Sequence, residues 1–225
     1  KVGLYGKHIL YPTEVMRNPD KMASSIGSRR YKRSNTVISV ATYQDNKDGT
    51  QKNLLSINAL CIDIDYCTSC DRDIRNMECD KAVSRFFCDI LLDEIIPMPT
   101  YIEYGRNFRL VYVLDNPYII PKSDTKRKSV LTFLRRVIQV ISEKIQSVED
   151  WGVDKRYKVT PYVRIPESLN IKWNFSQTNP IPVSIDEVRI WNSMPYVHLW
   201  DIEELADYLT VIKDEGFFNS ENPYV

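Results

Sequence analysis

The sequence has no apolar run of the roughly 18 residues that a membrane span needs, and its first ten residues lack the core of a signal peptide. We therefore expect a cytoplasmic protein. The 30 basic and 30 acidic residues cancel, so only local clusters of charge can indicate a nucleic acid partner. The chain has only two histidines, far apart, which disfavours nucleases that depend on a closely spaced histidine pair.

Cysteine is also scarce, and its spacing argues against zinc. A structural zinc site needs four closed ligands, normally in two pairs, whereas the five cysteines provide one CxxC pair, Cys67 and Cys70, with Cys79 nearby. Cys61 falls in a predicted strand and Cys88 in a predicted helix. We expect both to be reduced, buried thiols that act as small hydrophobic side chains.

The remaining composition is that of an ordinary folded protein, with 43% hydrophobic and 27% charged residues in a chain of 225. This length suits one domain with a full-sized core. We predict a single domain over residues 1–225, with an N-terminal portion at 1–53, a core at about 54–200 and a C-terminal helix at about 201–213. Because the chain starts at Lys1 and ends without a helix stop signal, we expect it to be part of a longer protein.

Hydrophobic periodicity predicts alternating strands and helices. The predicted strands are 36–43, 54–65, 100–104, 108–114, 159–165, 181–185 and 188–191. The first two are expected to form a hairpin, as are the strands that flank Gly105-Arg106-Asn107. Helices are predicted from an N-cap at Asp80 to Pro97, from Ser123 through an apolar stripe that ends at Val148, and over 201–213.

Two carboxylates interrupt the apolar strand at 54–65. Asp63 and Asp65 are two residues apart, so the pleat places both on one face, with their Cα atoms about 6.5 to 7 Å apart. Near a core such a pair repels unless a cation neutralises it, and carboxylate oxygens suit Mg²⁺ or Mn²⁺. The alternative is a strand end at which both side chains face solvent.

A third acid, Asp154, follows the long predicted helix and can be brought to the sheet as the chain returns. Three acids can hold two metal ions about 3.5 to 4 Å apart, which activate a hydroxyl and neutralise a leaving pyrophosphate. The alternative is a turn residue at the helix exit. If Asp154 is the wrong acid, Asp150 and Glu149 are the next candidates.

Three motifs follow one another along the chain. Residues 59–65 form a strand that carries two acids, residues 99–112 form a strand, a glycine turn and a second strand, and Val153-Asp154 precedes Arg164 by about ten residues. This ordered set, over about residues 36–172, resembles the catalytic domain of the archaeo-eukaryotic primase superfamily. The resemblance is greatest to the primase-polymerases of plasmids, phages and other mobile elements.

The resemblance implies an α+β fold with an RRM-like core, in which helices flank a mostly antiparallel sheet, and an additional N-terminal α/β portion. It implies a nucleotidyltransferase that acts as a DNA primase or DNA-directed polymerase in the replication of a mobile element or plasmid. Asp63, Asp65 and Asp154 would hold two Mg²⁺ or Mn²⁺ ions. The implied partners are nucleoside triphosphates, a single-stranded DNA template or primer-template, and a fused or separate helicase.

Nucleotide-binding residues follow from the same resemblance. Arg106, Arg109, Arg164 and Lys172 would neutralise phosphate charge, and Asn170 would close the site or only cap a turn. Arg109 stands where the family usually has histidine, but its fixed fork also matches phosphate oxygens. On its strand Arg109 alternates with valines, whereas Arg106 at a loop tip is equally well explained as a solvated side chain.

Two basic clusters stand out, and a solvated surface explains either of them alone. The first consists of Arg29, Arg30, Tyr31, Lys32 and Arg33. Before a strand of the catalytic sheet, it would bind a template backbone through its cations and stack a base on the tyrosine. The second lies at 122–136, on the long predicted helix.

Two other classes of function stay open. The chain fits a non-catalytic replication-initiator module that binds nucleotide or DNA and retains the fold. A metal-dependent nuclease would also use clustered acids, without needing triphosphates.

Overall fold

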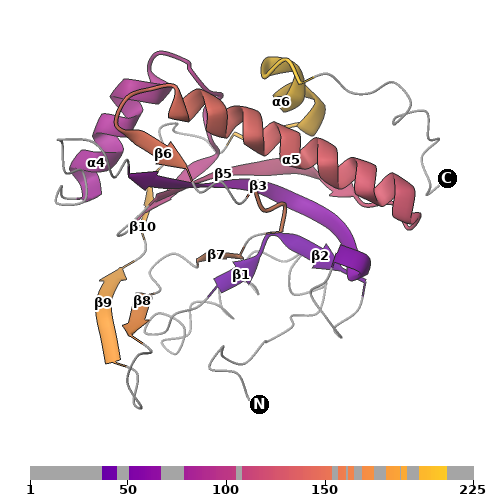
Figure 1. The fold of residues 1–225 in the computed structure, drawn as a ribbon, viewed down its shortest axis with the longest axis horizontal. Coiled ribbons are helices and arrows are strands. Elements are labelled where there is room, and N and C mark those ends of the chain that lie inside the picture. Colours follow the sequence, from indigo (N-terminus) through magenta and orange to yellow (C-terminus); the bar gives the residue numbers. More distant parts are fainter. Residues whose placement is uncertain are drawn as a thin grey trace.

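The computed structural model describes residues 37–44, 51–66, 79–104, 108–153, 157–160, 162–164, 169–174, 181–187, 189–191 and 198–211. It confirms the predicted α+β fold, in which a mostly antiparallel sheet packs against helices (Figure 1). Within these ranges, no helix has both the length and the apolar character that crossing a membrane requires. The domain limits predicted from the sequence stay a prediction.

The main sheet is built around one long strand. Its strands are β2 (Ala41–Tyr43), β3 (Leu54–Tyr66), β4 (Tyr101–Tyr104), β5 (Phe108–Ile119), β6 (Trp151–Val153) and β10 (Arg189–Trp191). They run in the order β10-β4-β5-β3-β2, and β6 pairs with the other end of β3. All of these pairs are antiparallel, and both predicted hairpins are confirmed, β2 with β3 and β4 with β5.

The other described strands form two separate two-stranded sheets. β1 (Val37–Ser39) pairs with β7 (Tyr162–Arg164), and β8 (Leu169–Asn174) pairs with β9 (Ile181–Glu187). The strand predicted at 36–43 is therefore wrong as one element: the chain bends at Val40, and the two halves join different sheets. β6 and β8 were not predicted, although β8 alternates apolar and polar residues.

Among the described residues, three helices pack against the sheet. Their bounds are Cys79–Phe86 for α4, Asp124–Gln146 for α5 and Ile202–Tyr208 for α6, with a π-helical turn, η3, at Phe87–Leu91 and a 3-10 turn, η1, at Gln51–Asn53. The predicted start of α5 after Ser123 is confirmed. Asp80 lies inside α4 and is not an N-cap, because the helix begins at Cys79. The helical region ends at Leu91, before a turn in which Glu94 has φ 53°, and α6 ends before Thr210 with φ 56°.

The core lies between the helices and one face of the sheet. Leu60, Ile62 and Ile64 of β3 belong to the same buried cluster as the apolar stripe of α5, including Val137 and Ile141. A smaller cluster of Val40, Ala59, Cys61, Val111 and Val163 covers the other face, on the side of β1 and β7 (Figure 1). Because β3 is buried on both faces, it has a nearly continuous apolar sequence.

The two described free thiols differ in burial. Cys61 is buried, as predicted, but Cys88 is exposed, so the prediction for Cys88 is wrong. The buried side of this helical segment is occupied by Phe86, Ile90 and Leu91, and Cys88 lies on its solvent side. Cys67 and Cys70 lie outside the described residues.

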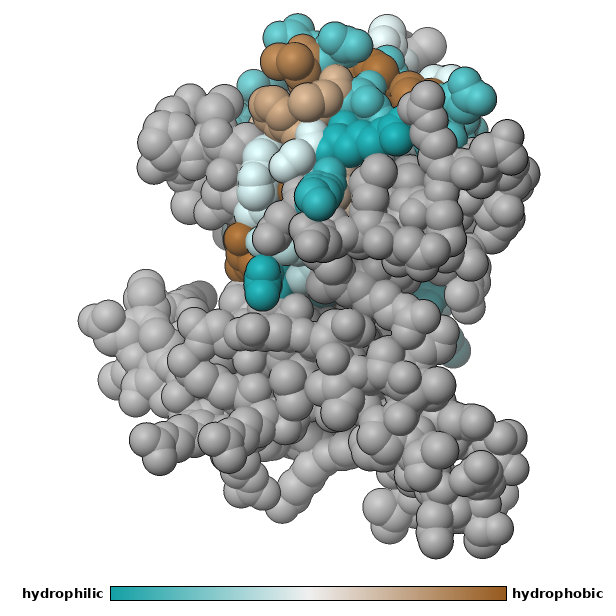
Figure 2. Space-filling view, turned by 90° about the vertical axis from the view of Figure 1, so that its left-hand side faces the viewer, coloured by the Kyte–Doolittle hydropathy of each residue, from teal (hydrophilic) through white to brown (hydrophobic). Residues whose placement is uncertain are grey.

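On the face in Figure 2, the described hydrophobic and hydrophilic residues are interspersed.

We predict that Asp201→Ala lowers the free energy of unfolding by about 1 kcal/mol, because Asp201 caps α6. Its carboxylate accepts hydrogen bonds from the backbone N–H groups of Glu203 at 2.7 Å and Glu204 at 3.2 Å. Asp201→Asn keeps an acceptor at the cap and should unfold like the parent. Urea denaturation followed by circular dichroism compares the variants, and equal midpoints for Asp201→Ala and the parent would contradict the capping role.

Candidate active site

Three charged residues lie side by side on the sheet face opposite the helices. The register pairs Asp63 of β3 with Arg109 of β5, and Arg109 with Glu103 of β4. Directly paired residues of antiparallel strands project to the same face of a sheet. Three adjacent strands therefore present a carboxylate, a guanidinium and a second carboxylate in one row, which we call the charged row.

The guanidinium contacts both carboxylates of the charged row. Nε of Arg109 donates a hydrogen bond to Oδ1 of Asp63, and Nη1 of Arg109 lies 3.8 Å from Oε2 of Glu103. The side chain of Asp63 is 42% exposed, that of Arg109 19% and that of Glu103 9%. The charged row thus runs from a buried end at Glu103 to a solvent-facing end at Asp63.

The electrostatic environment keeps Arg109 charged. Burial lowers the pKa of the guanidinium, but the hydrogen bond and charge of Asp63, together with the charge of Glu103, outweigh burial and raise the pKa above its ordinary value. A carboxylate buried as deeply as Glu103 is costly unless it is paired. Arg109 is therefore a permanent cation held between two acids.

Apolar side chains continue this face beyond the charged row. Cys61 precedes Asp63 by two residues, Val111 follows Arg109 by two, and both belong to the small core cluster. The position of Val111 agrees with the prediction that Arg109 alternates with valines on its strand. Burial raises the pKa of the Cys61 thiol far above its ordinary value, and burial has the same effect on the phenol of Tyr101. Both groups stay neutral at physiological pH, so the charge of this region is concentrated in the charged row.

β6 brings a third segment to the acidic end of β3. Val153 pairs with Ile64, and Gly152 pairs with Asp65. Ile64 lies between the two predicted metal ligands in the sequence, so the described part of β6 ends beside them, one residue before Asp154. Asp154 itself and the side chain of Asp65 lie outside what the structure describes.

The other predicted site residues are placed only in part. Arg164 ends β7 opposite Val37, and Asn170 and Lys172 lie within β8. The backbone of Asn170 belongs to a strand, and the role of its side chain stays a prediction. The side chains of these three residues are not described, and Arg106, Arg29, Arg30, Tyr31, Lys32 and Arg33 lie outside the described residues.

Asp150, one of the two alternatives for the third acid, is paired with a cation of α4. Its Oδ2 lies 2.9 Å from Nη2 of Arg85, whose Nε is 3.1 Å from Oδ2 of Asp89. The indole N–H of Trp151 also donates to Oδ2 of Asp89, at 3.1 Å. These bonds attach α4 to the turn before β6. The neighbouring Glu149 is exposed.

Glu103 is the residue of this site that the sequence reasoning missed. It lies inside the second motif, in the strand Tyr101–Tyr104, and was not singled out. An acid within an otherwise apolar strand was the available signal, the same signal that identified Asp63 and Asp65. Its partner, Arg109, was expected to contact phosphate and not a second carboxylate.

The chemistry of the acids fits a divalent cation. Carboxylate oxygens are the ligands that Mg²⁺ and Mn²⁺ prefer, and Asp63 is open to solvent on one side. Among the residues that the structure describes, no three His, Cys, Asp or Glu residues lie together in a metal-binding arrangement. The cation that neutralises Asp63 in this part of the chain is Arg109.

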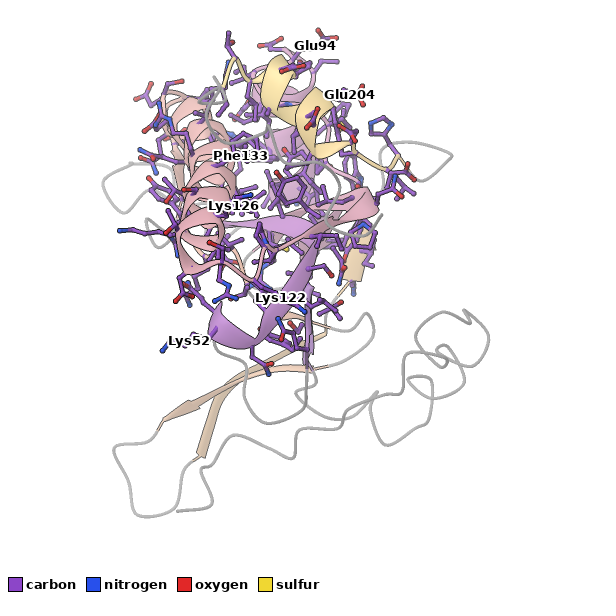
Figure 3. The ribbon with its side chains drawn as sticks, turned by 90° about the vertical axis from the view of Figure 1, so that its right-hand side faces the viewer. Lys52, Glu94, Lys122, Lys126, Phe133 and Glu204 are labelled. Atoms are coloured by element: carbon purple, nitrogen blue, oxygen red, sulfur yellow. The ribbon has the colours of Figure 1, made fainter. Side chains whose placement is uncertain are left out.

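The basic cluster of the long helix lies in the helical layer, not at the charged row. Lys122, Lys126 and Lys128 are exposed, and Figure 3 labels Lys122 and Lys126. Arg127 is held by Asp124 at 2.8 Å and by the carbonyl of Lys122 at 3.0 Å. The exposure of the lysines is compatible with the interpretation of this cluster as a solvated helix face, which stays a prediction.

A solved structure is similar to this chain, whereas family models and curated proteins are not. No protein-family model matches the chain, and neither does any curated protein. The AEP domain of the cyanophage S-2L primase-polymerase (PrimPol) is similar to this chain with 11% sequence identity and a TM-score of 0.44. The similarity covers 78% of this chain and 70% of that chain.

We predict that Asp150→Asn lowers the free energy of unfolding by about 1 to 2 kcal/mol, because it removes the charge that pairs with Arg85. Asparagine tolerates the positive φ of 79° at this position, so the backbone should be undisturbed. Glu149→Gln, one residue away on an exposed side chain, is the matched control and should be neutral. Chemical denaturation measures both, and equal effects of the two substitutions would refute the assignment of Asp150 to the α4 contact.

Proposed function

We propose that this domain is a template-directed nucleotidyltransferase, a DNA primase or DNA polymerase that uses two divalent metal ions. The observation that carries the proposal is the charged row. It joins a solvent-facing acid to a permanently charged guanidinium, beside Asp65 and beside the strand that leads to Asp154. Phosphoryl transfer needs little beyond positioning and neutralisation of charge, and acids next to an arginine supply both.

In this proposal the chain's acids and cations divide the work. Asp63, Asp65 and Asp154 hold the ions, which when bound favour deprotonation of a 3′-hydroxyl and neutralise the pyrophosphate that leaves. Arg109 binds the triphosphate through its planar fork, which matches phosphate oxygens better than a point charge does. The pairing of Arg109 with Asp63 supports this role, because it places the guanidinium directly beside a carboxylate that would hold an ion.

The remaining roles complete the proposal. Arg106, Arg164 and Lys172 add positive charge for the triphosphate, and Asn170 closes the site. Arg29, Arg30, Tyr31, Lys32 and Arg33 bind a single-stranded template or primer-template, with the affinity falling as salt rises. The biological setting would be replication of a mobile element or plasmid in the cytoplasm, with a fused or separate helicase.

A specific observation favours a second candidate, a nucleotide- or DNA-binding module without catalysis. Asp63 already has a cation, Arg109, and this arginine replaces the histidine usual in the family that the sequence resembles. A domain of this kind would bind nucleotide through Arg109 and need no metal ion at Asp63.

One experiment separates these functions. The protein is incubated with labelled deoxynucleoside and ribonucleoside triphosphates, a single-stranded template and Mn²⁺. Longer or newly made strands identify a polymerase or primase, whereas shortened strands identify a nuclease. Retention of nucleotide or template without any product identifies the binding module. The Asp63→Ala protein, purified in the same way, controls for a contaminating polymerase.

We predict that Asp63→Ala and Asp65→Ala each abolish metal-dependent synthesis while the domain stays folded. In the Asp63 variant Arg109 keeps Glu103 as a carboxylate partner, so the buried guanidinium is not left without a counter-charge. Asp154→Asn should bind DNA like the parent but lose turnover. Primer extension measures synthesis and circular dichroism measures folding. Normal synthesis by both strand variants would exclude the polymerase function, and full activity of Asp154→Asn would mean that a different residue is the third acid.

We predict that Arg109→Ala lowers kcat/KM for nucleotide roughly 10- to 150-fold, with template binding little changed. This range corresponds to the loss of one hydrogen bond to a charged phosphate. Arg109→Lys should substitute poorly because it lacks the fork. Arg109→His should keep part of the activity and lose it as pH rises through neutrality, because imidazole then loses its charge. Nucleotide titrations at two pH values test the series. Parent-like kinetics for Arg109→Ala would show that this arginine is only structural.

A further inference from the structure

We propose that Arg109 and a divalent cation compete for Asp63, and that Glu103 is a positioning residue that holds Arg109 when it releases Asp63. The inference rests on the proposed function, since it takes Asp63 as a metal ligand. It adds that the metal site is closed by an internal cation until a nucleotide engages the guanidinium. Metal ion and nucleotide then bind cooperatively.

Competition follows from the contact at Asp63. Nε of Arg109 donates to Oδ1 of this carboxylate, so one of its two oxygens is taken by a guanidinium. A divalent ion on the same carboxylate would lie within a few ångströms of that positive charge, in a region where solvent screening is reduced by burial of the arginine. Either cation therefore weakens the binding of the other.

Glu103 determines where Arg109 goes when Asp63 takes an ion. Its Oε2 lies 3.8 Å from Nη1 of Arg109, a distance that closes to a hydrogen bond with a small movement of the guanidinium. Its carboxylate is the more buried of the two, so it loses more than Asp63 would if the guanidinium left. The guanidinium is thus expected to remain at Glu103 and give up Asp63.

The backbone limits this change to a side-chain movement. Arg109 is paired in register with Asp63 on one side and with Glu103 on the other, so its Cα is fixed between the two acids. A triphosphate offers the guanidinium a new acceptor on the solvent side, which draws it away from Asp63. By thermodynamic linkage, nucleotide and metal ion then raise each other's affinity by the same factor, typically about 5- to 150-fold.

The test measures Mn²⁺ binding to the whole chain without nucleotide, by electron paramagnetic resonance of the free ion, so that no turnover is involved. Arg109→Ala should bind Mn²⁺ about 5- to 150-fold more tightly than the parent. Glu103→Gln should bind it several-fold more weakly, because Arg109 then has Asp63 as its carboxylate partner in the row. In the Arg109→Ala background, Glu103→Gln should have little further effect, because the residue through which Glu103 acts is gone.

A measurement on the parent guards against variants that fold poorly. Titration with Mg²⁺ should shift the ¹⁵N–¹H signal of Arg109 Nε, identified by its absence in Arg109→Lys, because its hydrogen bond to Asp63 is lost. Circular dichroism of each variant reports folding separately.

The possible outcomes separate this inference from the proposed function. Equal Mn²⁺ affinity of Arg109→Ala and the parent, with binding abolished by Asp63→Ala, would refute the competition and leave the metal site intact. A Glu103→Gln effect that persists without Arg109 would show that Glu103 acts directly on the ion and is not a positioning residue. Absence of Asp63-dependent binding in every protein would overturn the metal site and the inference together.

Discussion

The pairing of Arg109 with Asp63 and Glu103 is the interaction on which the site depends. Two acids on a sheet face that is partly buried must be neutralised, and one guanidinium between them does so. This constraint couples three residues on three strands. It also gives the face a permanent cation beside a solvent-facing acid, and the proposed nucleotidyl transfer rests on this pair.

The packing of the rest of the fold determines where the charged row lies. The helix-facing side of β3 carries Leu60, Ile62 and Ile64 into the core, so the residues that alternate with them are left for the opposite face. The side of β3 opposite β5 pairs with β6, whose position is held through Asp150 by Arg85 of α4. Packing on the helix-facing side of the sheet thereby holds β6, which leads to Asp154, next to the end of β3 that carries Asp63 and Asp65.

The sequence predicted the parts of this structure whose signals are local. A β-branched, apolar run identified β3, the spacing of Val137 and Ile141 identified α5, and alternation with valines identified the face of Arg109. The break at Val40 could not be predicted, because the first half of this apolar run pairs with β7, which is distant in the sequence, while the second half forms the local hairpin with β3. β6 is too short for any periodicity, and Glu103 becomes significant only once the register places it beside Arg109. The exposure of Cys88 was available from the sequence, because the residue lies off the apolar stripe of Phe86, Ile90 and Leu91 that packs on the core.

The most direct test of the account is anomalous diffraction from crystals of the chain grown with Mn²⁺ and a non-hydrolysable deoxynucleoside triphosphate. The account predicts an anomalous peak at the carboxylate of Asp63, with Arg109 turned from that carboxylate to the triphosphate and still next to Glu103. A nucleotide bound elsewhere, with no peak at Asp63 and with Arg109 still hydrogen-bonded to it, would contradict the account.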